Sequence, residues 1–143
     1  MDISFYAHEI DFELQEQELV KDWLLFLVRN EGQTLQDLSY IFVSDDYLLG
    51  LNREHLQHDY YTDILTFPYH TEGNPIIGEI YISVDRVADN ANTFSVSADD
   101  ELQRVMAHGV LHLMGYDDHE EADIVLMRKK EQSALEAWNQ KSF

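Results

Sequence analysis

Apolar residues recur three and four positions apart in several segments of the chain, which is the spacing of a helix with one buried face. The pattern is clear over residues 15–29, and a further helix with a cap at Asp45 is predicted to run to Asn52. The pattern is weaker over residues 85–94 and returns over residues 120–140. These segments are expected to be helices packed on a common core.

The most regular helical pattern lies between Ser97 and Gly115. Ser97 and Asp100 make a start that resembles a capping box, and Gly115 is a natural C-terminal stop. The apolar stripe of this helix is formed by Leu102, Val105, Met106, Gly109, Val110 and Leu113. Leu111 and Met114 add apolar residues on other sides, and a helix that is apolar all round is usually buried.

Four shorter segments are typical of β-strands. Residues 2–8 are predicted to form an edge strand, and residues 38–44 are rich in β-branched and aromatic residues. Residues 64–67 form a short strand that Pro68 ends. Residues 76–84 alternate between two kinds of side chain, so the two faces of this strand meet different environments. Together the segments predict an α+β domain in which helices pack on a small sheet.

The length and composition suit one compact domain over residues 1–143. The chain has no cysteine, which excludes disulfides, thiolate zinc ligands and a cysteine nucleophile. No apolar run is long enough to cross a bilayer, and the N-terminus lacks the pattern of a signal peptide. A cytoplasmic location is therefore expected.

The charge balance bears on possible partners. Asp and Glu number 28 against 9 Lys and Arg, and the formal net charge is −19. Proteins that bind nucleic acids usually present excess positive charge to phosphates. The balance alone argues against a polyanionic partner, although a local field can differ from the net charge. The one basic run, residues 128–130, is most simply a solvated helix face.

His108 and His112 lie four residues apart in the most regular helix. Residues at this spacing face the same way, as in helical zinc sites. A bare pair of this kind is most often two ordinary surface histidines. Here the helix ends in a glycine, and the chain turns back through an Asp-Asp-His sequence at residues 117–119, which can bring a third ligand. We therefore predict one Zn²⁺ ion with an open fourth position, which favours catalysis.

Gly109 occupies the position directly after the first histidine and leaves space beside it. Helical zinc peptidases carry a glutamate at this position as the general base. A metal-dependent peptidase is therefore an alternative whose hydrolytic machinery is incomplete.

Three ordered motifs extend the pattern: HGVLHLMGYD at residues 108–117, TDILTFP at 62–68 and GEIYIS at 78–83. They are similar to H-G-x-L-H-L-x-G-Y-D-H, T-[ND]-V-L-S-F-P and G-D-I-x-I-S, the motifs of the YbeY family of endoribonucleases. Their order and separations agree over about residues 40–130, and three ordered matches are hard to obtain by chance.

The resemblance implies a small mixed four-stranded sheet packed with about five helices, with the zinc helix at the centre. It implies a zinc-dependent endoribonuclease specific for single-stranded RNA, which acts in maturation of the 16S rRNA 3′ end and in ribosome quality control. The implied partners are ribosomal RNA and the small ribosomal subunit, rather than DNA or a membrane. A ribosome-associated protein with a purely structural zinc is the alternative.

The chain departs from the family motif at the third zinc ligand. The family's third histidine falls at Asp118, and His119 lies one residue further along. His119 is the preferred ligand, because imidazole is the softer and commoner partner of zinc. Asp118 is the alternative, because it offers a charged oxygen.

A second departure concerns an arginine that the resemblance places near the metal, where it would bind phosphate. Leu56 stands at that position. Arg53, His55 and His58 are candidates to reach the same space, although each is more simply an exposed polar residue near a helix end. Glu79 is a candidate general base, although a structural carboxylate in the sheet is the simpler interpretation. The catalytic residues are therefore left open.

Overall fold

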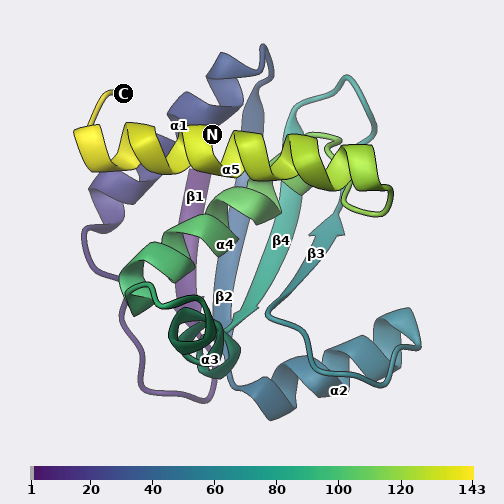
Figure 1. Ribbon diagram of the computed structural model, residues 1–143. Helices are drawn as coiled ribbons and strands as arrows, with labels where there is room; N and C mark the ends of the chain where they lie inside the picture. Colours follow the sequence, from purple (N-terminus) through teal and green to yellow (C-terminus); the bar gives the residue numbers. More distant parts are fainter. Residues whose placement is uncertain (1) are drawn as a thin grey trace.

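The computed structural model describes residues 2–143, which are built around one mixed β-sheet (Figure 1). The strands are β1 (Asp2–Ala7), β2 (Leu35–Val43), β3 (Ile64–Pro68) and β4 (Ile76–Ser83). They lie in the order β1-β2-β4-β3, with β1, β2 and β4 parallel and β3 antiparallel to β4. The first strand is therefore an edge strand, as its sequence predicts, and β3 forms the other edge.

Five helices pack around this sheet in the described part of the chain. They are α1 (Gln17–Asn30), α2 (Asp45–Leu56), α3 (Val84–Phe94), α4 (Ala98–Leu113) and α5 (Glu121–Gln140). Helix α4 contacts α1, α3 and α5 as well as β3 and β4, so the helix that carries the histidine pair is central. The α+β class and the mixed four-stranded sheet are thus confirmed. No helix from residue 2 onward combines the length and apolarity needed to cross a membrane.

The alternation of side chains along the strands divides the core into two unequal parts. The larger part lies between the sheet and the layer of α1, α3, α4 and α5, and includes Leu38 and Tyr40 of β2 and Ile80 of β4. The smaller part lies on the opposite face, where Ile41 of β2 packs with Leu48 of α2. Because successive residues of a strand point to opposite faces, β2 contributes to both parts.

Glycines allow α4 to lie directly against β3 and β4. A Cβ atom at Gly109 would lie 2.9 Å from the Cδ1 atoms of Ile64 and Ile80, closer than packed side chains approach. A Cβ atom at Gly78 of β4 would lie 2.8 Å from Cδ1 of Leu113, at the end of α4. The two glycines therefore set the separation between helix and sheet. The open space expected at Gly109 is filled by isoleucine side chains.

Helix α4 begins and ends where its sequence predicts. The hydroxyl of Ser97 accepts a hydrogen bond from the backbone N–H of Asp100 at 3.0 Å. At the other end, Gly115 takes a φ of +106°, which a residue with a side chain rarely adopts. The turn after α4 is therefore sharp, and it returns the following residues toward the helix.

The predicted cap of α2 at Asp45 is wrong. Ser44, one residue earlier, is the cap, and its hydroxyl accepts a hydrogen bond from the backbone N–H of Tyr47 at 3.1 Å. The Asp45 carboxylate instead accepts hydrogen bonds from Ser83 at 3.0 Å and Arg86 at 2.6 Å, and so joins the starts of α2 and α3. Local propensity does not separate the two residues, because serine and aspartate are comparable caps.

We expect Gly109→Ala to lower the free energy of unfolding by about 1–3 kcal/mol, the usual effect of overpacking a dense core. Urea denaturation followed by circular dichroism measures the change. The matched control is Gly50→Ala, since a Cβ atom at Gly50 in α2 meets nothing within 4 Å. There alanine should raise the stability by about 0.5–1 kcal/mol through its higher helix propensity. Equal stabilities of Gly109→Ala and the wild type would contradict the close contact.

Candidate metal centre

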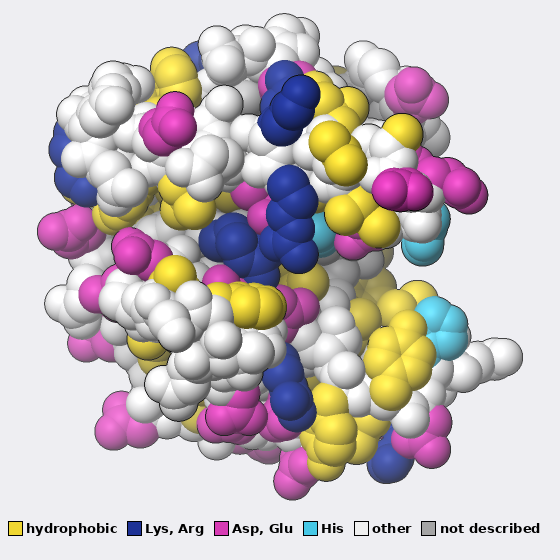
Figure 2. Space-filling model, in the orientation of Figure 1, with side chains coloured by type: hydrophobic (Ala, Val, Ile, Leu, Met, Phe, Trp, Pro, Cys, Tyr) yellow, Lys and Arg dark blue, Asp and Glu magenta, His cyan; other side chains and the backbone are white. Residues whose placement is uncertain are grey.

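His108 and His112 of α4 line a pocket that opens between α4, α5 and the loop joining α2 to β3. Figure 2 shows a hollow at the right of this face, with histidine side chains on its upper and lower edges. Asp118 and His119, from the turn after α4, line the same pocket. The contact of Gly109 with the sheet fixes the rotation of α4 about its axis, and this rotation directs the two imidazoles into the pocket.

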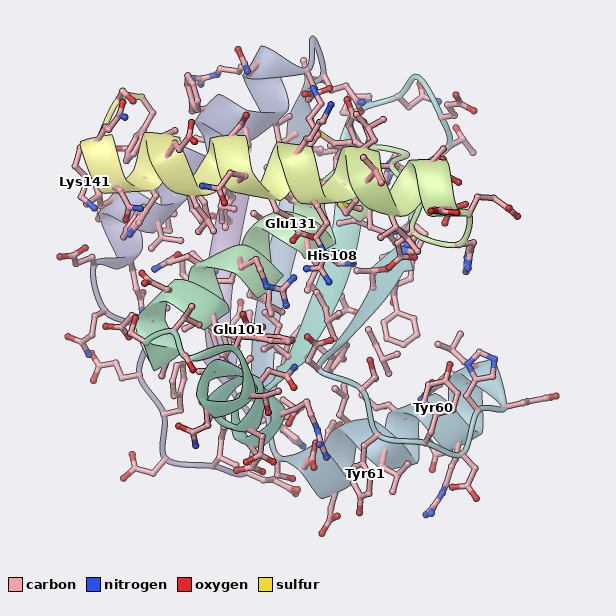
Figure 3. The ribbon with its side chains drawn as sticks, viewed as in Figure 1. Tyr60, Tyr61, Glu101, His108, Glu131 and Lys141 are labelled. Atoms are coloured by element: carbon pink, nitrogen blue, oxygen red, sulfur yellow. The ribbon has the colours of Figure 1, made fainter. Side chains whose placement is uncertain are left out.

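Each imidazole is oriented by a hydrogen bond from its Nδ1 atom. Nδ1–H of His108 donates to the Glu131 carboxylate of α5 at 2.7 Å (Figure 3), and Nδ1–H of His112 donates to the carbonyl oxygen of Tyr116 at 3.1 Å. A carbonyl oxygen only accepts, so the hydrogen of His112 lies on Nδ1. A ring that carries one proton, on Nδ1, keeps Nε2 as an electron-pair donor, which is how metal-binding histidines are usually held.

The turn after α4 brings carboxylates to these histidines. Oδ2 of Asp118 lies 3.3 Å from Nε2 of His108. His112, Asp117 and Asp118 each offer an atom within 4.8 Å of the others, so they form a group that could hold a metal ion. Nε2 of His119 instead lies 3.3 Å from Oδ1 of Asp117, and its side chain is 77 % exposed. Asp118 is therefore the residue of the turn that approaches both helical histidines, while the third ligand stays a prediction.

One pair of donor atoms, from His108 and Asp118, has the spacing of two ligands on a tetrahedral metal ion. Two ligand atoms that lie about 2.0–2.1 Å from a tetrahedral zinc ion are about 3.3 Å apart. Nε2 of His108 and Oδ2 of Asp118 have this separation. The electron pair of Nε2 and the carboxylate oxygen would repel each other at this distance. A cation shared by both atoms, or a second proton on the ring, removes this repulsion. These residues therefore fit a divalent cation with nitrogen and oxygen ligands.

A buried charge network surrounds His108. Arg104 donates hydrogen bonds to both carboxylate oxygens of Glu101, at 2.9 and 2.6 Å, and to Glu131 at 3.0 Å. Burial raises the pKa of Glu131, but the hydrogen bonds and charges of His108 and Arg104 hold that pKa below its ordinary value. Asp63 lies 3.8 Å from Arg104, and burial raises the pKa of its carboxyl group. Glu131 is thus a carboxylate that holds the ring of His108 in place.

The centre is acidic even though two arginines, Arg104 and Arg128, line its pocket. Five carboxyl groups lie near these arginines or near the histidines, those of Asp63, Glu101, Asp117, Asp118 and Glu131. A divalent cation would offset much of this excess negative charge. The pocket would then be able to accept an anionic ligand.

The arginines that line the pocket come from α4 and α5. Arg53 pairs with Asp59 and is not among the described residues that line the pocket, so it does not replace the family arginine. Leu56 does line the pocket and is 42 % exposed. Arg104 and Arg128 supply the positive charge instead. Helical spacing could have identified Arg104, because it precedes the first histidine by four residues and shares its face.

Of the other polar candidates from the sequence, one lines the pocket and two do not. His58 lines the pocket, whereas the ring of His55 packs edge-on against Phe67 with centroids 5.8 Å apart. Glu79 accepts a hydrogen bond from the Tyr69 hydroxyl at 2.7 Å and does not line the pocket described here. Glu79 therefore lies on the sheet outside the candidate site.

Gly109 explains why no peptidase base follows the first histidine. Its backbone faces Ile64 and Ile80, and a glutamate there would collide with these side chains. The position that supplies the general base of helical zinc peptidases is therefore closed in this fold.

The chain is similar over nearly its whole length to proteins of one family. Residues 2–139 match the family model described as Endoribonuclease YbeY. The Endoribonuclease YbeY of Flavobacterium psychrophilum is 44 % identical over 139 residues, which cover 97 % of this chain and 98 % of that protein. The Endoribonuclease YbeY of Cytophaga hutchinsonii is 43 % identical over 133 residues, 93 % of each chain. The solution structure of TM1509 from Thermotoga maritima has a TM-score of 0.68 and 31 % identity, covering 98 % of this chain and 91 % of that one.

We expect Glu131→Gln to weaken Zn²⁺ binding about 10- to 100-fold, the usual effect of losing the partner that orients a metal-binding histidine. Competition with a chromogenic chelator measures the affinity. Glu136→Gln is the matched control, because Glu136 lies exposed on the same helix. Unchanged affinity in a folded Glu131→Gln variant would show that the hydrogen bond to His108 does not support a metal site.

Proposed function

The chain belongs to the Endoribonuclease YbeY family, and we propose that it cleaves single-stranded RNA with one Zn²⁺ ion held in the pocket on α4. One observation carries the metal part of this proposal. Both α4 histidines have Nδ1 engaged in a hydrogen bond, and both line one pocket beside a carboxylate. Family membership supports RNA as the substrate, and the donor geometry supports the metal.

We assign the ion to His108, His112 and Asp118. Neutral imidazole and carboxylate are established zinc ligands, and the chain has no cysteine to offer a thiolate. Asp118 is favoured over His119 by the 3.3 Å separation between its Oδ2 and Nε2 of His108. A zinc ion with three protein ligands supplies Lewis-acid polarisation of a phosphoryl oxygen and activates water at neutral pH.

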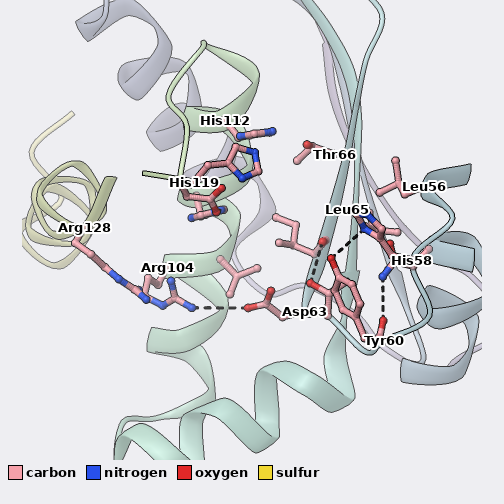
Figure 4. A pocket seen from close by; sticks show the side chains of 16 residues that line it. Leu56, His58, Tyr60, Asp63, Leu65, Thr66, Arg104, His112, His119 and Arg128 are labelled. Atoms are coloured by element: carbon pink, nitrogen blue, oxygen red, sulfur yellow. Dashed lines mark hydrogen bonds and ion pairs between the residues drawn. The ribbon is translucent and has the colours of Figure 1, made fainter. Parts of the chain in front are cut away.

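Arg128 is the phosphate-binding side chain in this proposal. It lines the pocket and is 61 % exposed, with Nη1 3.3 Å from the Glu131 carboxylate. A guanidinium group pairs well with phosphate oxygens. Arg104 is engaged by Glu101 and Glu131 and serves to hold the network around the histidines. Arg128 thus takes, from the opposite wall of the pocket, the role that Leu56 cannot perform (Figure 4).

Asp63 does not act as a general acid or base in this proposal. It lines the pocket, and burial raises the pKa of its carboxyl group. The family motif accepts asparagine as well as aspartate at this position. An amide side chain has no carboxylate to take up a proton. The 3.8 Å separation between Asp63 and Arg104 instead supports a role in balancing the arginine charge.

The biological substrate in this proposal is ribosomal RNA. Family membership supports action on the 3′ end of 16S rRNA and in ribosome quality control, in the cytoplasm and on the small ribosomal subunit. A chain with a net charge of −19 gains little from long-range attraction to RNA. The charge therefore favours a protein partner on the ribosome that brings the RNA segment to the pocket.

The third ligand is tested by comparing zinc affinities. Asp118→Ala should weaken Zn²⁺ binding by more than about 100-fold, beyond the effect of losing an orienting partner alone. His119→Ala should change it less than about threefold, because the ring is exposed and lies beside Asp117. Chelator competition measures both affinities. The reverse order of effects would assign the third position to His119.

RNA cleavage is tested on a hairpin with an unpaired tail. The zinc-loaded chain should cut the tail and leave casein intact, and His112→Ala should abolish cutting. His55→Ala is the control, since His55 packs on Phe67 outside the pocket. For single strands, the logarithm of the RNA binding constant falls by about 0.7 per phosphate contact for each tenfold rise in salt concentration. With few phosphate contacts, cleavage should therefore fall only modestly as salt rises. Bound zinc without cleavage at any salt concentration would favour a structural metal.

A further inference from the structure

The wall of the pocket opposite α4 is formed by the last residue of α2 and the start of the loop between α2 and β3. Leu56, His58 and Tyr60 line the pocket there, and Figure 4 shows them across from Arg128 and His112. Tyr60 is 56 % exposed, although it belongs to the pocket lining. An exposed aromatic ring at the mouth of a site has apolar surface that a ligand can cover.

The ring of Tyr60 is held in one orientation by His58. The two rings are stacked, with centroids 5.1 Å apart and planes inclined by 21°. The Tyr60 hydroxyl also lies 2.9 Å from Nδ1 of His58, in hydrogen-bonding contact. One face of the tyrosine is thus backed by a second aromatic ring.

The loop beneath these rings is fastened to α2. Asn52 is buried, and its side-chain N–H donates to the backbone carbonyl of Tyr60 at 2.9 Å. The backbone N–H of His58 donates to the carbonyl of Asn52 at 3.1 Å, and Gln57 between them has the left-handed φ of 56° that ends the helix. The rings are therefore positioned before any ligand arrives, which lowers the entropic cost of binding.

The two walls of the pocket differ in chemistry. The wall formed by α4, α5 and the turn between them carries the residues that could hold a metal ion and the exposed guanidinium of Arg128. A metal ion and a guanidinium group both bind the oxygens of a phosphodiester. The opposite wall carries the stacked rings, which suit the flat face of a base. A single-stranded nucleotide has phosphate on one side and a base on the other, and proteins bind such strands by pairing cationic and aromatic surfaces.

We propose that Tyr60, backed by His58, is a platform on which one unpaired nucleobase stacks while the adjoining phosphate lies at the metal side of the pocket. The inference rests on the proposed ribonuclease function. Stacking uses the π-face that every base has, so the platform selects unpaired bases over paired ones and accepts different base identities. A base within a duplex is covered on both faces and is excluded.

Tyr61 provides a matched comparison within the same loop. Its hydroxyl donates to Asp46 at 3.2 Å, and Arg86 lies over its ring at 5.3 Å from the centroid. Tyr61 is exposed but does not line the pocket among the described residues. Replacing Tyr61 therefore removes the same type of side chain at a neighbouring position, without touching the proposed platform.

The test measures binding of a fluorescein-labelled hexanucleotide of 2′-O-methylribose to the zinc-loaded chain by anisotropy. Tyr60→Ala should raise the Kd about 5- to 100-fold, the range found for one stacked base. Tyr60→Phe and Tyr60→Trp should bind within about threefold of the wild type, because both keep an aromatic face. Tyr61→Ala should bind like the wild type. Since Tyr60 and Tyr61 are both exposed, all four variants should keep the wild-type unfolding midpoint and zinc content.

A second experiment separates stacking from a general loss of contact. It uses a set of hexanucleotides, each of which lacks the base at one position, and measures the binding of each to the wild type and to Tyr60→Ala. In the wild type, removal of the base at one position should weaken binding as much as Tyr60→Ala does. In Tyr60→Ala, removal of the same base should have no further effect. Equal losses in both proteins, or unchanged binding by Tyr60→Ala, would overturn the platform even if the wild type cleaves RNA. A zinc-loaded wild type that neither binds nor cleaves RNA would overturn the ribonuclease function together with the platform.

Discussion

At Gly109 the helix α4 has no side chain of its own, so Ile64 of β3 and Ile80 of β4 pack directly on its backbone, where a Cβ atom would collide with them. The helix can neither rotate about its axis nor move along the sheet without losing this contact. Because a helix is rigid over a few turns, the face that carries His108 and His112 is directed into the pocket by the same contact. The large core beneath α1, α3, α4 and α5 holds the helix against the sheet, so core packing and site geometry are parts of one constraint.

The site is completed by segments that fold back over α4. Helix α5 supplies Glu131 to Nδ1 of His108, and the turn supplies Asp118 near Nε2 of the same ring. The hydrogen bond with His108 and the charge of Arg104 hold the pKa of Glu131 below its ordinary value. The resulting excess of carboxylates explains how an acidic chain can present a site for RNA: the negative charge is concentrated where a divalent cation would offset it. Metal binding should therefore also stabilise the fold, since the same carboxylates are brought together by folding.

Several parts of this arrangement follow from local sequence. The limits of α4 follow from Ser97 and Gly115, because a cap and a positive φ are properties of neighbouring residues. Other parts do not. The choice of Ser44 over Asp45 as the cap of α2 depends on Arg86, which binds the aspartate from another helix. The sequence also left open which side chain near Leu56 reaches the pocket: His58 lines it, whereas Arg53 and His55 do not, and the arginines that line it come from α4 and α5.

The sequence by itself determined the α+β class, the course of the helices and strands, and the pairing of two histidines on one helical face. These properties depend on the 3.6- and two-residue periods of the backbone and on residues a few positions apart. Only the tertiary structure decided what surrounds the pair. The contact of Glu131 with His108 joins residues on two different helices, and the stacked Tyr60 lies across a pocket from the residues that could hold a metal ion. Such contacts depend on how whole elements pack, and the period of a single segment carries no information about its partner.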